Sequence, residues 1–175
     1  MSLELVDALG VRRDAAVIDV GGGSSLFAKS LLQRGFGDVS VLDVSVTGLR
    51  SLKARLGPGG HQVHMIRHDL LSWKPRRRYD LWHDRAVLHF FTGAVERARY
   101  VEVLDSAVAP GAKVIIGVFA ADGPDRCSAL PVMRYRAAQL VDLLGKSFHL
   151  AEERREQHRT PGGAVQSFTW VAFTR

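Results

Sequence analysis

Short apolar runs alternate along the chain with segments in which apolar residues recur every three or four positions. The runs predict five strands, at residues 15–20, 39–42, 63–66, 79–82 and 113–119. Helical spacing predicts helices at residues 2–9, 27–34, 46–56, 96–108 and 135–144, and a further helix that begins within 86–91. Strands that alternate with helices indicate a parallel, doubly wound α/β sheet.

Two further strands, at residues 148–155 and 167–173, close the chain. A turn with the sequence Thr-Pro-Gly-Gly at residues 160–163 joins them without a helix. Strands connected in this way form an antiparallel pair. A nicotinamide-binding domain would normally continue with another strand, helix and strand, so this pair separates the two kinds of nucleotide-binding sheet.

Three consecutive glycines, Gly21 to Gly23, end the first strand. Glycine permits a left-handed backbone and a close approach of the main chain to a ligand. Ser24 and Ser25 can cap the helix that follows, whose free amides would face that ligand. Such a turn also serves plain packing between a strand and a helix, so alone it is a weak indication of nucleotide binding.

An acidic residue after the second strand strengthens the indication. Asp43 lies 20 residues beyond Gly23, where this class of sheet places a carboxylate against ribose hydroxyls. The residues that follow, Val44 and Ser45, are not basic, which does not favour a nicotinamide phosphate. Asp69 follows the third strand in the same way.

These features together resemble the class I, seven-stranded S-adenosylmethionine-dependent methyltransferases. The segment 19–23, Asp-Val-Gly-Gly-Gly, resembles their first motif, and Asp43 resembles their ribose-binding acid. Asp69 resembles their adenine-contacting acid, and a Pro-Gly pair at 110–111 precedes the fifth strand as it does in them. Residues 82–86 and 122–128 look like those of a group of small bacterial methyltransferases of uncertain substrate.

The resemblance covers nearly the whole chain and implies a Rossmann-like sheet of seven strands. We expect the order 3-2-1-4-5-7-6 with only strand 7 antiparallel, because residues 167–173 return from their neighbour through a simple turn. It also implies S-adenosyl-L-methionine as the cofactor. The residues expected to bind it are Asp19, Gly21, Gly22, Gly23, Ser25, Asp43, Val44, Asp69, Leu70 and His83.

Within this set each residue type suits one part of the cofactor. Asp19 would help receive the ammonium group, directly or through water. An unpaired carboxylate at the end of an apolar strand is costly as mere packing, which favours a functional role for it. Asp43 would accept from both ribose hydroxyls, and Asp69 from the adenine amino group with Leu70 beside the ring. The glycine turn would approach the methionine portion.

Asp84 and His83 are the expected catalytic residues on the side of the methyl acceptor. They follow the fourth strand, and open α/β sheets bind ligands at the carboxyl ends of their strands. Asp84 can instead be a helix cap or a partner of Arg85, and His83 a group that supports others through hydrogen bonds. Further acceptor-pocket candidates are Cys127, Arg134, Tyr135 and His158, whereas His89 and the three tryptophans are expected to pack in the core.

Composition limits the number of domains, the location of the protein and the kinds of metal or disulfide site. With 175 residues and 46% hydrophobic content, we expect a single domain, residues 1–175. No apolar run approaches the ~20 residues that cross a bilayer, so we expect a cytoplasmic protein without membrane contact. A lone cysteine, Cys127, excludes an internal disulfide and a cysteine-rich zinc site, and we expect no metal.

A formal net charge of +6 suggests an acidic partner, with its densest basic cluster at Lys74 and residues 76–78. The cluster lacks interleaved aromatic residues for stacking, so we interpret it as a solvated loop and do not expect nucleic-acid binding. The acceptor is either a small molecule or a protein, and the oligomeric state is not predicted.

Two departures from the family pattern leave alternatives open. Ser25 stands where many members have a third motif glycine, and only 14 residues precede Ala15, so the segment that often covers cofactor and substrate is expected to be short or absent. The alternatives to a methyltransferase are a nicotinamide-dependent oxidoreductase and a non-catalytic cofactor-binding module.

Overall fold

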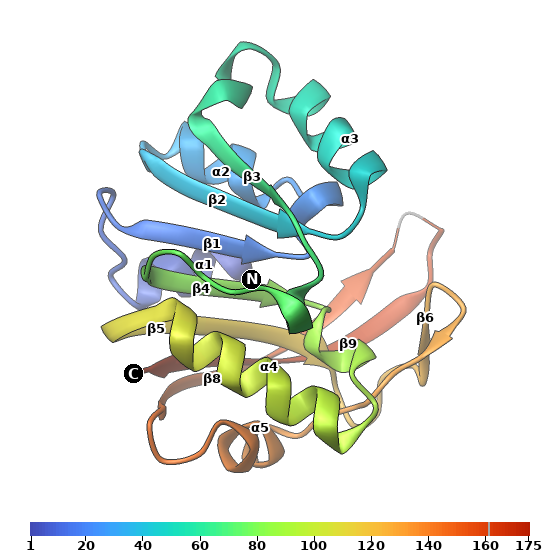
Figure 1. Cartoon of the computed structure of the whole chain (residues 1–175). Helices are drawn as coiled ribbons and strands as arrows, with labels where there is room; N and C mark the ends of the chain where they lie inside the picture. The colour runs from blue at the N-terminus through green and yellow to red at the C-terminus, as the bar shows by residue number, and fades with distance from the viewer. Residues whose placement is uncertain (161) are drawn as a thin grey trace.

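The chain folds into a sheet with helices on both faces (Figure 1). The structure is a computed structural model that describes residues 1–160 and 162–175, without the side chains of Ser24 and Pro58. Its strands are β1 Ala16–Val20, β2 Asp38–Asp43, β3 Val63–Arg67, β4 Tyr79–Arg85, β5 Val108–Phe119, β6 Arg126–Cys127, β7 Leu130–Pro131, β8 His149–Arg159 and β9 Val165–Thr174. Its α-helices are α1 Ser2–Ala8, α2 Phe27–Gln33, α3 Val46–Leu56, α4 Ala94–Ala107 and α5 Ala137–Leu144. Four 3-10 turns complete it: η1 Gly22–Ser24, η2 Gly57–Gln62, η3 Leu70–Ser72 and η4 Leu88–Phe90.

The large sheet has seven strands in the order β3-β2-β1-β4-β5-β9-β8. The pairs among β1 to β5 are parallel, whereas β9 runs antiparallel to both β5 and β8. The expected order, with only the last strand antiparallel, is therefore confirmed. The turn at 160–163 that was expected to join the last two strands includes Pro161, which lies outside the described residues.

Alternation of side chains along the strands builds two cores, one on each face of the sheet. Ile18 and Trp82 point to the face covered by α4 and α5; α4 lies in front of the sheet in Figure 1, and α5 lies at the bottom. Val17 and Leu81 point to the opposite face, where α1, α2 and α3 pack. All five residues of β1 are buried, as the apolar run predicted.

The fourth strand is longer than predicted. It was expected to end at Trp82, but it continues to Arg85, so His83 and Asp84 lie inside the sheet rather than after it. Both residues are paired on two sides: His83 stands between Asp19 of β1 and Ile115 of β5, and Asp84 stands beside it in the same register. Backbone pairing with two neighbouring strands thus extends β4 through polar residues that interrupt the apolar run.

The segment after β4 also differs from the prediction. The helix expected within 86–91 is a single 3-10 turn, η4. The long loop expected at 120–132 contains the small β6–β7 hairpin, drawn at the right of Figure 1. In the part of the chain that the structure describes, no helix is long and apolar enough to cross a membrane.

Candidate functional site

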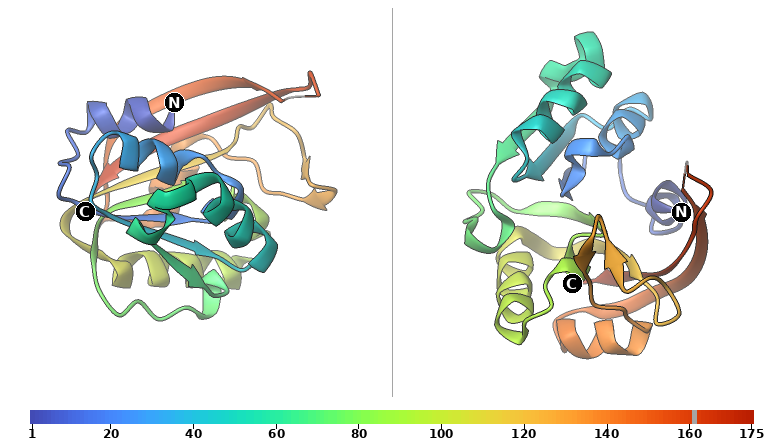
Figure 2. Two further views of the ribbon diagram at one scale, coloured as in Figure 1. Left: turned by 90° about the horizontal axis from the view of Figure 1, so that it is seen from above. Right: turned by 90° about the vertical axis from the view of Figure 1, so that its right-hand side faces the viewer.

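The carboxyl ends of the parallel strands surround a cavity of about 470 Å³. In Figure 1 the arrows of β1, β2 and β4 point toward this edge, and the right-hand view of Figure 2 looks onto it. Its lining residues are Gly21, Leu42, Asp43, Val44, His68, Asp69, Leu70, Arg85, Ala86, Val87, Phe90, Phe91, Cys127 and Ser128. Open α/β sheets bind their ligands at this edge, so we take this cavity as the candidate site.

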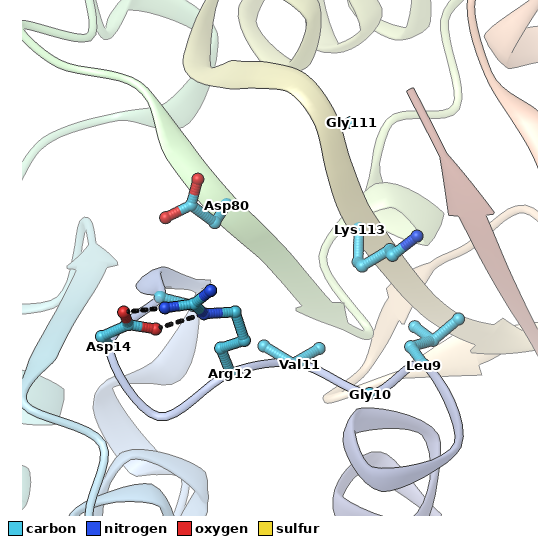
Figure 3. Close-up of a pocket in the computed structure, with 9 residues that line it drawn as sticks. Leu9, Gly10, Val11, Arg12, Asp14, Asp80, Gly111 and Lys113 are labelled. Carbon is cyan, nitrogen blue, oxygen red and sulfur yellow. Dashed lines mark hydrogen bonds and ion pairs between the residues drawn. The ribbon is translucent and has the colours of Figure 1, made fainter.

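A second cavity, of about 370 Å³, lies at the opposite edge of the sheet, where the strands begin (Figure 3). Its polar groups already have partners: Arg12 pairs with Asp14, and Asp80 Oδ2 accepts a hydrogen bond from the Ala16 amide at 2.8 Å. The cavity lies at the amino ends of β1 and β4, whereas such sheets bind their ligands at the carboxyl ends of the strands.

The glycine turn enters the site with a backbone that other residues do not fit. Gly21 has a φ of 67°, and a Cβ at this residue would lie 2.2 Å from Val87 Cγ2. Gly22 has no room either, because a Cβ there would lie 2.2 Å from Asp19 Oδ2. The glycines are therefore required by close approach of the chain. Ser25 was predicted to cap α2, but Leu26 is the N-cap and its side chain makes no capping hydrogen bond. Ser25 precedes the cap, and its Oγ accepts from the Phe27 amide at 2.9 Å.

The two acids expected at the ribose and the adenine both line the cavity. Asp43 Oδ2 accepts from the Gly23 amide at 2.8 Å, and Oδ1 accepts from the Ser45 amide at 2.7 Å. Asp69 Oδ1 accepts from the Leu71 amide at 3.0 Å. Each carboxylate oxygen has more than one lone pair, so both acids are held in place and keep capacity to accept from a ligand. Val44 and Leu70 also line the cavity.

Asp19 and His83 form a buried pair beneath the glycine turn. Asp19 Oδ1 lies 2.7 Å from His83 Nδ1, and His83 Nε2 lies 3.0 Å from Ser2 Oγ at the start of α1. Asp19 and His83 are each only 1% exposed. Neither lines the cavity, and Asp19 Oδ2 has no hydrogen-bond partner among the described residues.

Asp84 faces the other side of the sheet and is fully buried. Its Oδ1 accepts from the Val87 amide at 2.8 Å, and its Oδ2 accepts from the Leu88 amide at 3.0 Å and the Tyr100 hydroxyl at 2.8 Å. Burial raises the pKa of the Asp84 carboxyl to about 6, although these three donors and His83 oppose the rise. Asp84 therefore anchors the segment that forms the cavity wall, and the geometry favours a positioning role over the catalytic one expected from the sequence.

Most acceptor-pocket candidates lie elsewhere. Cys127 lines the cavity, but His158 lines a separate cavity beside α1, and Tyr135 is 3% exposed. Arg134 donates to the Gly123 carbonyl at 3.4 Å on the surface. His89 is buried, as expected, and burial lowers the pKa of its imidazole to about 4.

Several lining residues were not anticipated from the sequence. Arg85, Ala86, Val87, Phe90 and Phe91 form one wall of the cavity. Ala86 has a φ of 69°, which is unusual for a residue other than glycine and marks a strained turn directly after β4. The sequence does not indicate this positive φ, because alanine occurs in both strands and helices and is not a residue typical of left-handed turns.

Comparison with models of protein families found no match, and neither did comparison with curated proteins. Solved structures do match. A 1,6-didemethyltoxoflavin-N1-methyltransferase from Burkholderia thailandensis, crystallised with S-adenosylhomocysteine, is 22% identical over 99% of this chain and 76% of its own, with a TM-score of 0.77. An S-adenosylmethionine-dependent methyltransferase from Methanosarcina mazei is 16% identical over 98% and 96%, with a TM-score of 0.78.

The N-methyltransferase NodS from Bradyrhizobium japonicum is 14% identical over 99% of this chain and 84% of its own, with a TM-score of 0.73. The chain has the class I methyltransferase fold. In this methyltransferase fold the glycine turn, Asp43 and Asp69 stand at the carboxyl ends of three adjacent strands, where the sequence resemblance places the cofactor.

Proposed function

We propose that this protein is an S-adenosylmethionine-dependent methyltransferase, a single domain that binds its cofactor in the cavity at the carboxyl ends of the strands. The observation that carries the proposal is the convergence of Gly21 of the glycine turn, Asp43 and Asp69 on one cavity of about 470 Å³. Cavities of roughly 300–1,000 Å³ suit ligands of this size. Solved methyltransferase structures of the same fold that contain S-adenosylhomocysteine support the same proposal.

The chemistry of the lining matches the parts of the cofactor in order along the sheet. Asp43 at the end of β2 would accept from both ribose hydroxyls, and charge-assisted bonds of this kind are strong. Asp69 at the end of β3 would accept from the adenine amino group, with Val44 and Leu70 as apolar neighbours. The turn of Gly21 to Gly23, followed by Ser25, would run along the methionine portion. Asp19, buried beneath the turn, would help receive the ammonium group directly or through water.

S-adenosylmethionine, when bound, supplies a methyl group on a sulfonium. The task left to the chain is to hold donor and acceptor in line and to exclude water. The wall of Arg85, Ala86, Val87 and Phe90 would do this, and Asp84 fixes that wall through the Val87 and Leu88 amides. His83 and Asp84 act in this proposal by positioning, since neither reaches the cavity.

The acceptor is a small molecule or a protein, and no lining residue selects between them. We propose a cytoplasmic location, for which the half-buried Cys127, with no other cysteine in the sequence to pair with, suits a reducing compartment.

Titration calorimetry with S-adenosylmethionine, S-adenosylhomocysteine and NADH tests the proposal. We expect both sulfur compounds to bind and NADH not to bind. Asp43→Ala should weaken binding of S-adenosylhomocysteine by about 1–3 kcal/mol, because it removes charge-assisted bonds to the ribose. Asp14→Ala is the matched control, since that carboxylate pairs with Arg12 on the surface at the far edge of the sheet.

Binding of NADH but of neither sulfur compound would overturn the proposal in favour of the oxidoreductase alternative. Unchanged affinity in the Asp43 variant would remove that residue from the site while leaving the cofactor assignment to the other residues.

A further inference from the structure

A chain of hydrogen bonds connects the amino-terminal helix to the glycine turn through the interior of the protein. Ser2 Oγ of α1 lies 3.0 Å from His83 Nε2, and His83 Nδ1 lies 2.7 Å from Asp19 Oδ1. Asp19 and His83 come from adjacent strands, where they are paired in register. These contacts use both ring nitrogens of a histidine that solvent does not reach.

The direction of the hydrogen bonds follows from the acceptor at one end. The Asp19 carboxylate can only accept, so we assign a proton to His83 Nδ1. The other ring nitrogen, Nε2, contacts Ser2 Oγ at 3.0 Å, so the ring is held at both ends. The orientation of the ring therefore determines which way the Asp19 carboxylate is turned.

Packing holds this ring in one orientation. The Phe27 ring of α2 stacks on His83 with centroids 3.9 Å apart and planes at 23°. Trp170 of β9 lies nearly parallel to it at 6.3 Å, and the Trp170 indole is itself fixed by donating to Glu156 Oε2 at 2.7 Å. Rotation of the imidazole would give up two hydrogen bonds and the stacking contact together.

The second carboxylate oxygen of Asp19, Oδ2, is the atom of this chain of hydrogen bonds that a ligand could contact. Oδ2 is buried and has no hydrogen-bond partner among the described residues. It lies against the turn so closely that a Cβ on Gly22 would be 2.2 Å away. A buried carboxylate oxygen without a donor is costly, and buried polar groups are normally paired. A donor brought to the turn by a ligand would satisfy it.

We propose that His83 is a positioning residue that holds Asp19 with one oxygen turned to the glycine turn, and that Ser2 makes the amino-terminal helix part of the cofactor site. The inference rests on the proposed function and deepens it: the half of the cofactor recognised through this chain is the amino-acid half, with its ammonium group. The sequence alone suggested a catalytic or cofactor-contacting role for His83, but the imidazole lines neither cavity next to it.

Two substitutions of His83 separate its nitrogens. Asn places an amide donor near the position of Nδ1 and lacks a group at Nε2, whereas Gln reaches the position of Nε2 and lacks one at Nδ1. Each folded variant is titrated with S-adenosylhomocysteine and with 5′-methylthioadenosine, which lacks the amino-acid half. Ser2→Ala removes the outer contact, and Ser30→Ala, a serine of α2 in the cavity beside α1, is its control.

We expect His83→Gln to lower the affinity for S-adenosylhomocysteine about tenfold or more and His83→Asn to lower it by less than about threefold, because only Asn keeps the donor to Asp19. Ser2→Ala should give a smaller loss than His83→Gln, and Ser30→Ala none. Affinity for 5′-methylthioadenosine should be unchanged throughout. If His83→Gln does not fold, the ratio of the two affinities in Ser2→Ala decides in its place.

A merely structural role would lower the melting temperature of the variants and leave the ratio of the two affinities as in the wild type, and that result would overturn the inference. So would equal losses in the Asn and Gln variants. These outcomes differ from failure of the proposed function, in which the unaltered protein itself binds neither sulfur compound and the inference falls with it.

Discussion

Asp19 and Asp84 are buried carboxylates on adjacent strands whose surroundings differ. Asp84 lies on the α4 face, where three donors satisfy both oxygens. Asp19 lies on the face of α1 and α2, where one oxygen meets His83 and the other has no partner among the described residues. The hydrogen bonds of Asp84 are complete within the protein, whereas Asp19 keeps one oxygen to which no described residue donates.

The difference between the two residues shows that burial of a carboxylate does not by itself indicate its role. Both residues follow apolar runs near strand ends, and both are costly unless paired. Asp84 is explained by the fold, since it anchors the segment after β4 from inside. Asp19 is not explained by the fold, which is why we assign it to ligand binding. The comparison predicts opposite responses of stability and affinity to substitution.

The largest effect is expected for Asp84→Ala. This substitution leaves the Val87 and Leu88 amides and the Tyr100 hydroxyl without their acceptor, and each stranded donor costs about 1–3 kcal/mol. We expect a loss of about 3–6 kcal/mol in the free energy of unfolding, measured by urea denaturation. Tyr100→Phe, which removes one of the three donors, is the control and should cost less. A loss below about 1 kcal/mol in Asp84→Ala would show that the anchor is dispensable.

Asp84 and His89 are two buried groups whose pKa values shift in opposite directions, so they change the stability in opposite ways as the pH rises. The pKa of Asp84 is raised to about 6, so its contribution is present below its ordinary pKa of 3.8 and is lost as pH rises through 6. The pKa of His89 is lowered from 6.5 to about 4, so its contribution is present above 6.5 and is lost as pH falls through 4. At about 1.36 kcal/mol per pKa unit, each amounts to about 3 kcal/mol.

The two contributions oppose one another between about pH 4 and 6.5. In His89→Leu the free energy of unfolding should therefore fall with rising pH relative to the wild type, because the variant lacks the His89 contribution, which increases with pH. In Asp84→Asn it should rise. Urea denaturation at four or five pH values gives the slope of the free energy of unfolding against pH. Equal slopes for the wild type and both variants would contradict the opposed contributions of Asp84 and His89.

Asp19→Asn should behave in the opposite way to Asp84→Ala. The variant keeps the shape of the side chain and removes a charge that the fold does not fully satisfy, so we expect stability to change by less than about 1 kcal/mol. Affinity for S-adenosylhomocysteine should fall by about 10–100-fold, the equivalent of one charged hydrogen bond. Calorimetry and urea denaturation on the same preparation measure both. A destabilised variant with unchanged affinity would show that Asp19, like Asp84, serves the fold and does not bind the cofactor.

The last prediction concerns a substitution that crowds Asp19 without changing it. In Gly22→Ala the new Cβ would lie 2.2 Å from Asp19 Oδ2, so the carboxylate or the turn must shift, at a cost of about 1–3 kcal/mol. Affinity for S-adenosylhomocysteine should fall as well. Gly37→Ala is the control, since no heavy atom lies within 4 Å of a Cβ there. Equal behaviour of the two variants would show that the close approach is not required.

Much of the fold could be predicted because it depends on local pattern. The helix at 46–56 was predicted with the bounds that α3 has, and each large-sheet strand was placed to within a few residues except at the ends of β4, β5 and β8. The glycine turn and the acids Asp43 and Asp69 were found because their spacing along the chain reflects the geometry of consecutive strands and turns.

Partners that are distant in sequence could not be predicted. Asp19 meets His83 across 64 residues, and His83 meets Ser2 across 81. Tyr100, which completes the environment of Asp84, lies in the middle of α4, and no sequence pattern marks it as a partner of Asp84. Residue type says that a buried carboxylate needs donors, but it does not say which residues supply them.

The sequence by itself determined the succession of strands and helices, the glycine turn and the acids that follow β2 and β3, since periodicity and turn chemistry act over a few residues. Only the tertiary structure decided that His83 and Asp84 lie inside β4 and face opposite sides of the sheet, one toward Asp19 and the other toward Tyr100. The physical reason is that consecutive strand residues point to opposite faces, and which helix covers each face is settled when the layers pack.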